Sequence, residues 1–125
     1  YDFKDRRSSM MDLNSKEVLL FTSDKLGEGD HELGEILMKS FIHVLSESSK
    51  IPSTIIFYNS GVKLTTEDSV CSKDLEIIGK NGAELLICGT CADYYNIKEK
   101  ISVGKISNMV TIVQELQDAK KVLKP

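Results

Sequence analysis

One stretch of the sequence decides the fold and the place of the chemistry: Ala83-Glu84-Leu85-Leu86-Ile87-Cys88-Gly89-Thr90-Cys91. Its apolar first half predicts a buried strand, and the residues from Cys91 to about Asn96 favour a helical turn or two. Two thiols three residues apart therefore lie at a strand-to-helix turn. The free N–H groups of a helix start favour a thiolate over a thiol. We expect reversible sulfur chemistry on Cys88, with Cys91 in support.

Apolar runs of the same kind recur on both sides of this stretch, and each is followed by a helical pattern. Strands are predicted at 17–22, 54–58, 83–87 and 103–106. Helices are predicted at about 30–48 with Asp30 as N-cap, from about Ser69 to Gly79, and from Ser107 or Asn108 with an apolar stripe that includes Leu123. Residues 62–69 are predicted to be a loop. This alternation predicts an α/β, Rossmann-like three-layer sandwich with a mostly parallel sheet and helices on both faces.

Length and composition limit the classes of function. With 125 residues the chain is one domain by size, predicted at 16–125 after a polar linker at 1–15. A net charge of −3 without a basic block disfavours nucleic acid and anionic membranes as partners, and the apolar runs are far shorter than the ~20 residues of a membrane span. Three cysteines cannot all pair within the chain, which favours a reducing, cytoplasmic setting.

Four loops are predicted to meet at one edge of the sheet. Ligands of open parallel sheets bind beyond the carboxyl ends of the strands, and the loops there would be 23–29, 59–61, 88–91 and 107–108. Besides the two catalytic candidates Cys88 and Cys91, these loops hold the polar and glycine residues predicted to line a binding site: Gly27, Gly29, Asn59, Gly61, Gly89, Thr90 and Asn108.

Other interpretations of the loops are weaker. No second pair of cysteines and no histidine at ligand spacing accompanies Cys88 and Cys91, so neither a metal nor another cofactor is predicted. Cys71 lies on the apolar face of its expected helix and is predicted to be a core residue. His31 is the one candidate for a proton donor or acceptor, although an exposed position in the first turn of its helix explains it better. Glu32 stands where a dinucleotide-binding loop would need a third glycine after Gly29.

The sequence resembles the DsrE-like family in four stretches: Gly27-Glu28-Gly29, Phe57-Tyr58-Asn59-Ser60-Gly61-Val62-Lys63-Leu64, Cys88-Gly89-Thr90-Cys91-Ala92-Asp93-Tyr94-Tyr95 and Val103-Gly104-Lys105-Ile106-Ser107-Asn108-Met109. Within the family it is most similar to the C-terminal domain of the YedF group, sulfurtransferase-like proteins associated with selenium metabolism. The resemblance implies a Rossmann-like fold, homo- or hetero-oligomers, and a persulfide on the cysteine after the third strand, here Cys88. Cys91 has no counterpart in the TusD group of the family, and Asn96 stands where glycine is expected.

The resemblance also implies partners. Full-length members of the YedF group begin with a TusA-like domain built around a cysteine, so we expect such a domain upstream of the linker at 1–15. A TusA-like domain or another sulfur-carrier thiol protein is the expected partner.

Three functions follow as hypotheses. The first is a sulfur-relay or sulfurtransferase-like domain that carries sulfur, or selenium, as a persulfide. The second is a thiol–disulfide oxidoreductase that uses both cysteines, although the chain lacks a proline placed as in thioredoxins. The third is a non-enzymatic, oligomeric binding or regulatory module with two inert, buried thiols.

Overall fold

A five-stranded, all-parallel sheet in the order β4-β3-β2-β1-β5 forms the centre of the domain. The computed structural model describes residues 16–125, so the predicted linker at 1–15 lies outside the described residues. The strands are β1 (Glu17–Phe21), β2 (Thr54–Phe57), β3 (Glu84–Cys88), β4 (Lys105–Ser107) and β5 (Lys121–Leu123).

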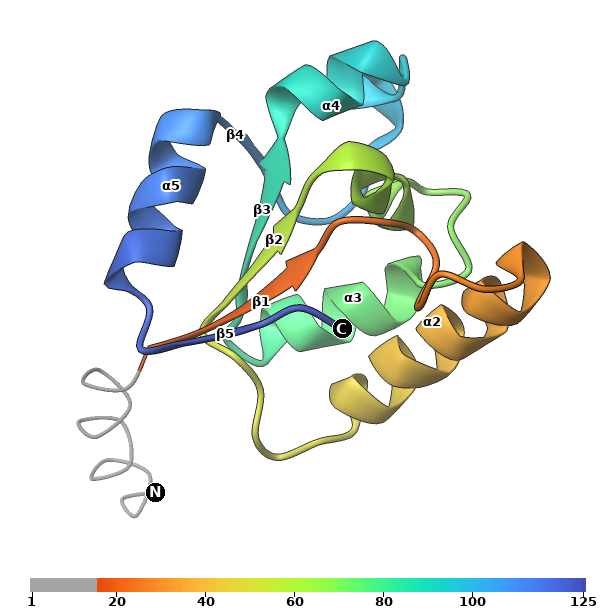
Figure 1. Cartoon of the computed structure of the whole chain (residues 1–125), viewed down its shortest axis with the longest axis horizontal. Helices are drawn as coiled ribbons and strands as arrows, with labels where there is room; N and C mark the ends of the chain where they lie inside the picture. Colours follow the sequence, from red (N-terminus) through yellow and green to blue (C-terminus); the bar gives the residue numbers. More distant parts are fainter. Residues whose placement is uncertain (1–15) are drawn as a thin grey trace.

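Helices cover both faces of this sheet, as Figure 1 shows. The helices α2 (His31–Ser46) and α3 (Ser72–Lys80) pack side by side on one face, and α5 (Met109–Asp118) lies on the other. The short helix α4 (Gly89–Tyr94) follows β3, with the 3₁₀ helices η1 (Asn59–Thr65) and η2 (Lys98–Lys100) beside it. The predicted three-layer α/β fold with a parallel sheet is confirmed.

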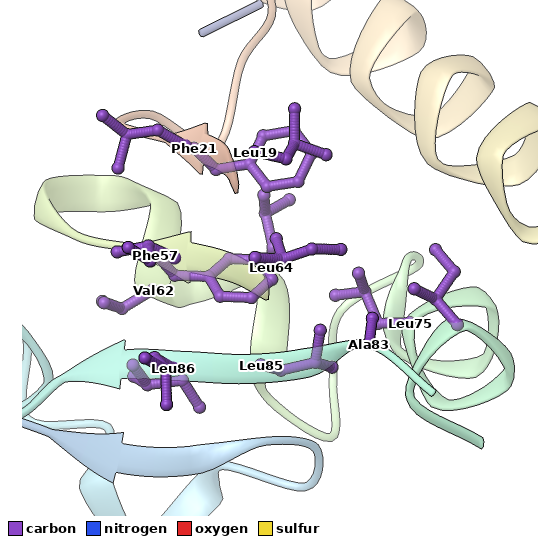
Figure 2. Packing of buried hydrophobic residues seen from close by; sticks show 14 of the residues in the cluster. Leu19, Phe21, Phe57, Val62, Leu64, Leu75, Ala83, Leu85 and Leu86 are labelled. Atoms are coloured by element: carbon purple, nitrogen blue, oxygen red, sulfur yellow. The ribbon is translucent and has the colours of Figure 1, made fainter. Parts of the chain in front are cut away.

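The three central strands are apolar along their length because both of their faces are covered. Almost every residue of β1, β2 and β3 is buried, and Figure 2 shows their side chains packed against those of η1 and α3. Phe21 lies at the centre of an aromatic group. Its ring stacks on that of Phe57 with centroids 5.5 Å apart and meets Phe41 edge-on at 6.0 Å. This group connects the ends of β1 and β2 with α2.

The helix starts follow the capping residues of the sequence. The Asp30 carboxylate accepts a hydrogen bond from the Leu33 N–H at 2.9 Å, and α2 begins at the next residue. The Asn108 side chain caps α5 in the same way, accepting from the Thr111 N–H at 3.0 Å. Both caps confirm the predicted positions, because a side-chain oxygen here satisfies an N–H group that lacks a helical partner.

The end of the chain was predicted wrongly. Leu123 does not extend the stripe of α5, which ends at Asp118; it lies in the edge strand β5, paired with Leu19 of β1. The error arises because β5 is short and exposed, and because no glycine or proline separates it from the helix. A five-stranded sheet therefore replaces the predicted four strands.

Three smaller corrections concern boundaries. The segment predicted as a loop at 62–69 continues the 3₁₀ helix η1 up to Thr65. The helix expected from Ser69 begins at Ser72, and Cys71 is its N-cap, buried as predicted. The strand expected at 103–106 is shifted to Lys105–Ser107, because Gly104 has a φ of +82° and lies outside the strand.

Candidate functional site

The two thiols lie where the apolar pattern placed them, at the turn between β3 and α4. Cys88 is the last residue of β3 and the N-cap of α4. Its side chain is only 2% exposed and belongs to the core. Cys91, within the first turn of α4, is half-buried and packs against the core from outside. The pair therefore combines an inner and an outer thiol.

A backbone amide from another loop contacts the outer thiol. The Asn59 N–H donates a hydrogen bond to the Cys91 sulfur at 3.0 Å. Asn59 has a φ of +52°, in the left-handed region that asparagine tolerates better than most residues. The Tyr95 hydroxyl donates to the Asn59 side-chain oxygen at 3.2 Å, and the Lys63 ammonium lies 4.4 Å from the centre of the Tyr95 ring. Three residues from η1 and the end of α4 thus contact the Cys91 sulfur or support its donor: Asn59, Lys63 and Tyr95.

Strand pairing explains why these loops meet. β2 and β3 are parallel neighbours, with Phe57 paired to Ile87, so the residues that follow both strands emerge side by side. The Tyr58 N–H donates to the Phe21 carbonyl at 3.1 Å, and Gly61 lies so close to that carbonyl that a Cβ atom would overlap it. Gly61 therefore lets η1 pack directly on the end of β1.

Burial dominates the titration of the outer thiol. It raises the pKa of Cys91 above the ordinary value of 9.0, and the neighbouring Cys88 thiol adds to this rise in pKa. The Asn59 N–H opposes them, because a donated hydrogen bond stabilises the thiolate. At Cys91 the direction is thus the opposite of the one expected from a helix start. Burial also raises the pKa of Cys71, the core thiol at the start of α3.

The structure brings some of the predicted binding residues to the thiols. Asn59 contacts Cys91 directly, and Gly61 positions the loop that holds Asn59. Gly89 begins α4 and lies against β4, where an added Cβ would come within 3.2 Å of the Ser107 carbonyl oxygen. Thr90, between the two cysteines, is exposed.

The remaining residues predicted to line the site make no hydrogen bond to either thiol in the described part of the chain. Gly27 and Gly29 are exposed in the loop after β1, and that loop reaches η1 through a hydrogen bond from the Asp24 N–H to the Ser60 hydroxyl at 3.3 Å. Asn108 uses its side chain to cap α5. His31 is the exposed first residue of α2 and makes no hydrogen bond to the thiol pair.

Sequence reasoning missed two parts of this site. Lys63 was not singled out, because a lone lysine in a loop carries no distinguishing pattern. Tyr95 appears in the sequence analysis only as the end of one stretch shared with the DsrE-like family, with no role of its own. Their partners are distant in sequence: 36 positions separate Tyr95 from Asn59. No motif records such a pairing.

Within residues 16–125, no group of three or more His, Cys, Asp or Glu side chains is arranged to hold a metal ion. None of the helices in this described part of the chain has both the length and the apolar character needed to span a bilayer.

Comparisons with solved structures show the same fold elsewhere. The ychN protein from E. coli matches with a TM-score of 0.65 at 17% identity, over 88% of this chain and 99% of that one. A conserved protein of unknown function, BT1422 from Bacteroides thetaiotaomicron, matches with a TM-score of 0.65 at 17% identity, over 92% and 98%. MTH1491 from Methanobacterium thermoautotrophicum, also of unknown function, has a TM-score of 0.63 at 16% identity, over 89% and 99%.

Sequence comparison identifies the family. No curated protein matches the chain. The pattern of the DsrE/DsrF-like family, however, matches residues 38–125, which include β2, β3 and the thiol pair. With its parallel sheet and its relatives in structure, the chain therefore belongs to the DsrE/DsrF-like family.

Proposed function

We propose that this domain carries sulfur as a persulfide on the Cys88–Cys91 pair, with Cys88 as the thiol that holds it. The observation that carries the proposal is the pair itself, two neighbouring thiols at the end of β3 with a backbone N–H donated to one sulfur. Membership of a family associated with sulfur relay supports it. The sulfurtransferase-like YedF group, the use of selenium and a cytoplasmic setting belong to the same proposal.

The chemistry needs only thiols. A thiolate of the pair attacks the outer sulfur of a donor persulfide R–S–SH, the S–S bond of the donor breaks, and RS⁻ leaves. RS⁻ then takes up the proton that the attacking thiol had lost and becomes RSH. An acceptor thiolate then attacks the outer sulfur of the protein persulfide and restores the protein thiolate. A TusA-like domain or another sulfur-carrier thiol protein is the proposed acceptor. No net oxidation occurs, so the cycle requires no cofactor.

Intact mass tests the proposal. The reduced protein, incubated with glutathione persulfide and freed of excess donor, should gain the mass of one sulfur atom, about 32 Da. Cys88→Ser can hold the added sulfur only on Cys91, the outer thiol, which lies closer to solvent. This variant should therefore retain less sulfur than wild type once the donor is removed. Cys71→Ala serves as the control, since this core thiol lies at the start of α3, and should retain sulfur as wild type does. A wild type without added sulfur would refute the function; a Cys88→Ser variant that retains as much as wild type would refute the role of Cys88.

A thiol–disulfide oxidoreductase is the second candidate. The Cys88 thiol is close enough to Cys91 to raise its pKa, so a disulfide between them is chemically reasonable. Under the same incubation glutathione persulfide would act as the oxidant and be released as glutathione and hydrogen sulfide, and the protein would lose two hydrogens, about 2 Da, instead of gaining sulfur. The third hypothesis, a binding module with two buried thiols, is disfavoured because Cys91 is only half-buried.

Assembly with further copies of the chain is also part of the proposal. The solvent side of α5 and the neighbouring strand β4 expose four apolar side chains: Ile106, Met109, Val110 and Val113. Apolar groups gathered on one surface are typical of subunit contacts. Their position at the start of α5 would bring a second copy close to the thiol-bearing end of the sheet.

Val110→Asp is therefore expected to dissociate the oligomer. Val110 is 73% exposed, so the change leaves the core intact while it would bury a charge in a subunit contact. Light scattering after gel filtration should show wild type as an oligomer and the variant shifted towards monomer. Val70→Asp, at an equally exposed valine before α3, should remain oligomeric. A monomeric wild type would contradict the proposed assembly.

A further inference from the structure

We propose that sulfur enters the pair at Cys91 and then passes inward to Cys88, and that Tyr95 is a positioning residue that holds the Asn59 amide on the Cys91 sulfur. This inference rests on the proposed sulfur-carrying function. It keeps Cys88 as the cysteine that holds the persulfide, as expected from the sequence, and adds an earlier step on Cys91.

Accessibility carries the first step. Cys88 is 2% exposed and closes β3 inside the core, so a donor can reach its sulfur only when the surrounding structure opens. Cys91 is half-buried, one turn further along, with one side towards solvent. The outer thiol therefore meets the donor first, although burial keeps most of it protonated at neutral pH.

Two exchanges describe the path of the sulfur atom. The Cys91 thiolate attacks the outer sulfur of R–S–SH, giving Cys91–S–SH and RS⁻. The Cys88 thiolate then attacks that same outer sulfur, giving Cys88–S–SH and a Cys91 thiolate, which regains the proton that Cys88 gave up. Each exchange breaks one S–S bond and forms another, so no oxidant or reductant is consumed. The transferred sulfur ends on the thiol that is shielded from solvent.

The Asn59 amide has a defined part in both exchanges. Cys91 carries negative charge before it attacks the donor and again after Cys88 takes the sulfur from it. The Asn59 N–H, 3.0 Å from this sulfur, stabilises that charge. It can do so only while Asn59 keeps its left-handed conformation, with φ at +52°.

Tyr95 supports that conformation through the Asn59 side chain. Its hydroxyl donates to the Asn59 side-chain oxygen, and its own ring is held by the Lys63 ammonium 4.4 Å above it and by the edge of Tyr94, with ring centroids 5.2 Å apart. Tyr95 therefore acts on Cys91 through Asn59, because its hydroxyl binds the Asn59 side chain and not the Cys91 sulfur. Charged groups on the neighbouring segments are paired: Asp93 with Lys98 at 3.1 Å, and Asp24, whose N–H bonds to the Ser60 hydroxyl, with Lys25 at 3.1 Å.

The rate of sulfur loading tests the order of events. With glutathione persulfide as donor, Cys91→Ser should load about tenfold or more slowly than wild type, because the donor must then reach the buried thiol. Cys88→Ser should load at nearly the wild-type rate, with the added sulfur found on Cys91 in fragment spectra. Cys91→Ser loading at the wild-type rate would overturn the order of events and leave the sulfur-carrying function standing. A wild type that never gains sulfur would overturn both.

The pH profile of Cys91 alkylation tests the role of Tyr95 without any sulfur donor. Iodoacetamide should modify Cys91 first in the folded protein, with a midpoint above pH 9.0. Tyr95→Phe removes the hydroxyl that fixes Asn59, so the midpoint should rise by about half a pH unit. Tyr94→Phe keeps the ring that packs against Tyr95 and removes only the hydroxyl of a residue that is 83% exposed, so it should leave the midpoint unchanged.

A second variant guards against a purely structural effect. Asn59→Gly keeps the amide and the left-handed backbone but loses the side-chain oxygen that Tyr95 binds, so it should move the midpoint in the same direction as Tyr95→Phe. Midpoints that stay at the wild-type value in both variants, or a Cys88 that is alkylated before Cys91, would overturn the inference.

Discussion

Gly61→Ala is expected to lower the free energy of unfolding by about 3 kcal/mol, near the upper end of the cost of overpacking. The added methyl group would overlap the Phe21 carbonyl oxygen and lie 3.0 Å from its carbonyl carbon. Neither atom is the flexible end of a side chain, since both belong to the backbone of β1. The same carbonyl accepts the Tyr58 N–H at 3.1 Å, so it cannot turn away without breaking that bond. The overlap between the added methyl group and the Phe21 carbonyl can therefore be relieved only if η1 moves away from the sheet.

Urea denaturation followed by circular dichroism would measure this loss. Gly29→Ala is the matched control, because an added Cβ there meets no atom within 4 Å and the φ of Gly29 is not positive. Its free energy of unfolding should stay close to that of wild type or rise slightly, since alanine restricts the unfolded chain. Equal stabilities of Gly61→Ala and Gly29→Ala would contradict the close packing of η1 on β1.

A consequence for the thiol site follows from the same contact. Asn59 lies two residues before Gly61, in the segment that would be displaced. Stability and chemistry are therefore coupled in this loop: the glycine that permits its packing also fixes the amide that contacts Cys91. A binding site built on a loop needs such a rigid support to keep a hydrogen bond of 3.0 Å in place.

The sequence was sufficient for the features that depend on local pattern. The apolar runs at β1, β2 and β3 predicted buried parallel strands because both faces of such strands are covered. Asp30 and Asn108 predicted helix starts because their side chains satisfy free N–H groups close to them in sequence. The order of the strands then placed the thiols at the carboxyl end of the sheet.

Features that depend on distant contacts could not be predicted in this way. β5 forms because it pairs with β1, about a hundred residues earlier in the chain. Its own three residues are exposed, and they are too few to show the alternating or apolar pattern of a strand. The difference between an inner Cys88 and an outer Cys91 depends on packing around α4, which spacing does not report. The hydrogen bonds from Asn59 to Cys91 and from Tyr95 to Asn59 arise from the pairing of β2 with β3.

Phe57→Ala should cost about 3–5 kcal/mol of unfolding free energy, the range found for buried aromatic residues. Phe57 is completely buried at the end of the central strand β2, and its ring stacks on Phe21 at a centroid distance of 5.5 Å. Figure 2 shows it between the end of β1 and the side chains of η1. Truncation removes the stacked ring and leaves a cavity that the sheet cannot close, because β2 is paired on both sides.

Phe41→Ala provides the matched comparison for this loss. Phe41 meets the same Phe21 ring edge-on at 6.0 Å, but it is half-buried on α2, where water can fill the space left by its ring. The smaller loss of buried area predicts a cost of about half that of Phe57→Ala. Urea denaturation midpoints of the two variants test this comparison, provided that the dependence of the unfolding free energy on urea concentration is the same in both. A larger loss for Phe41→Ala would mean that the helix face, and not the centre of the sheet, dominates the stability of this domain.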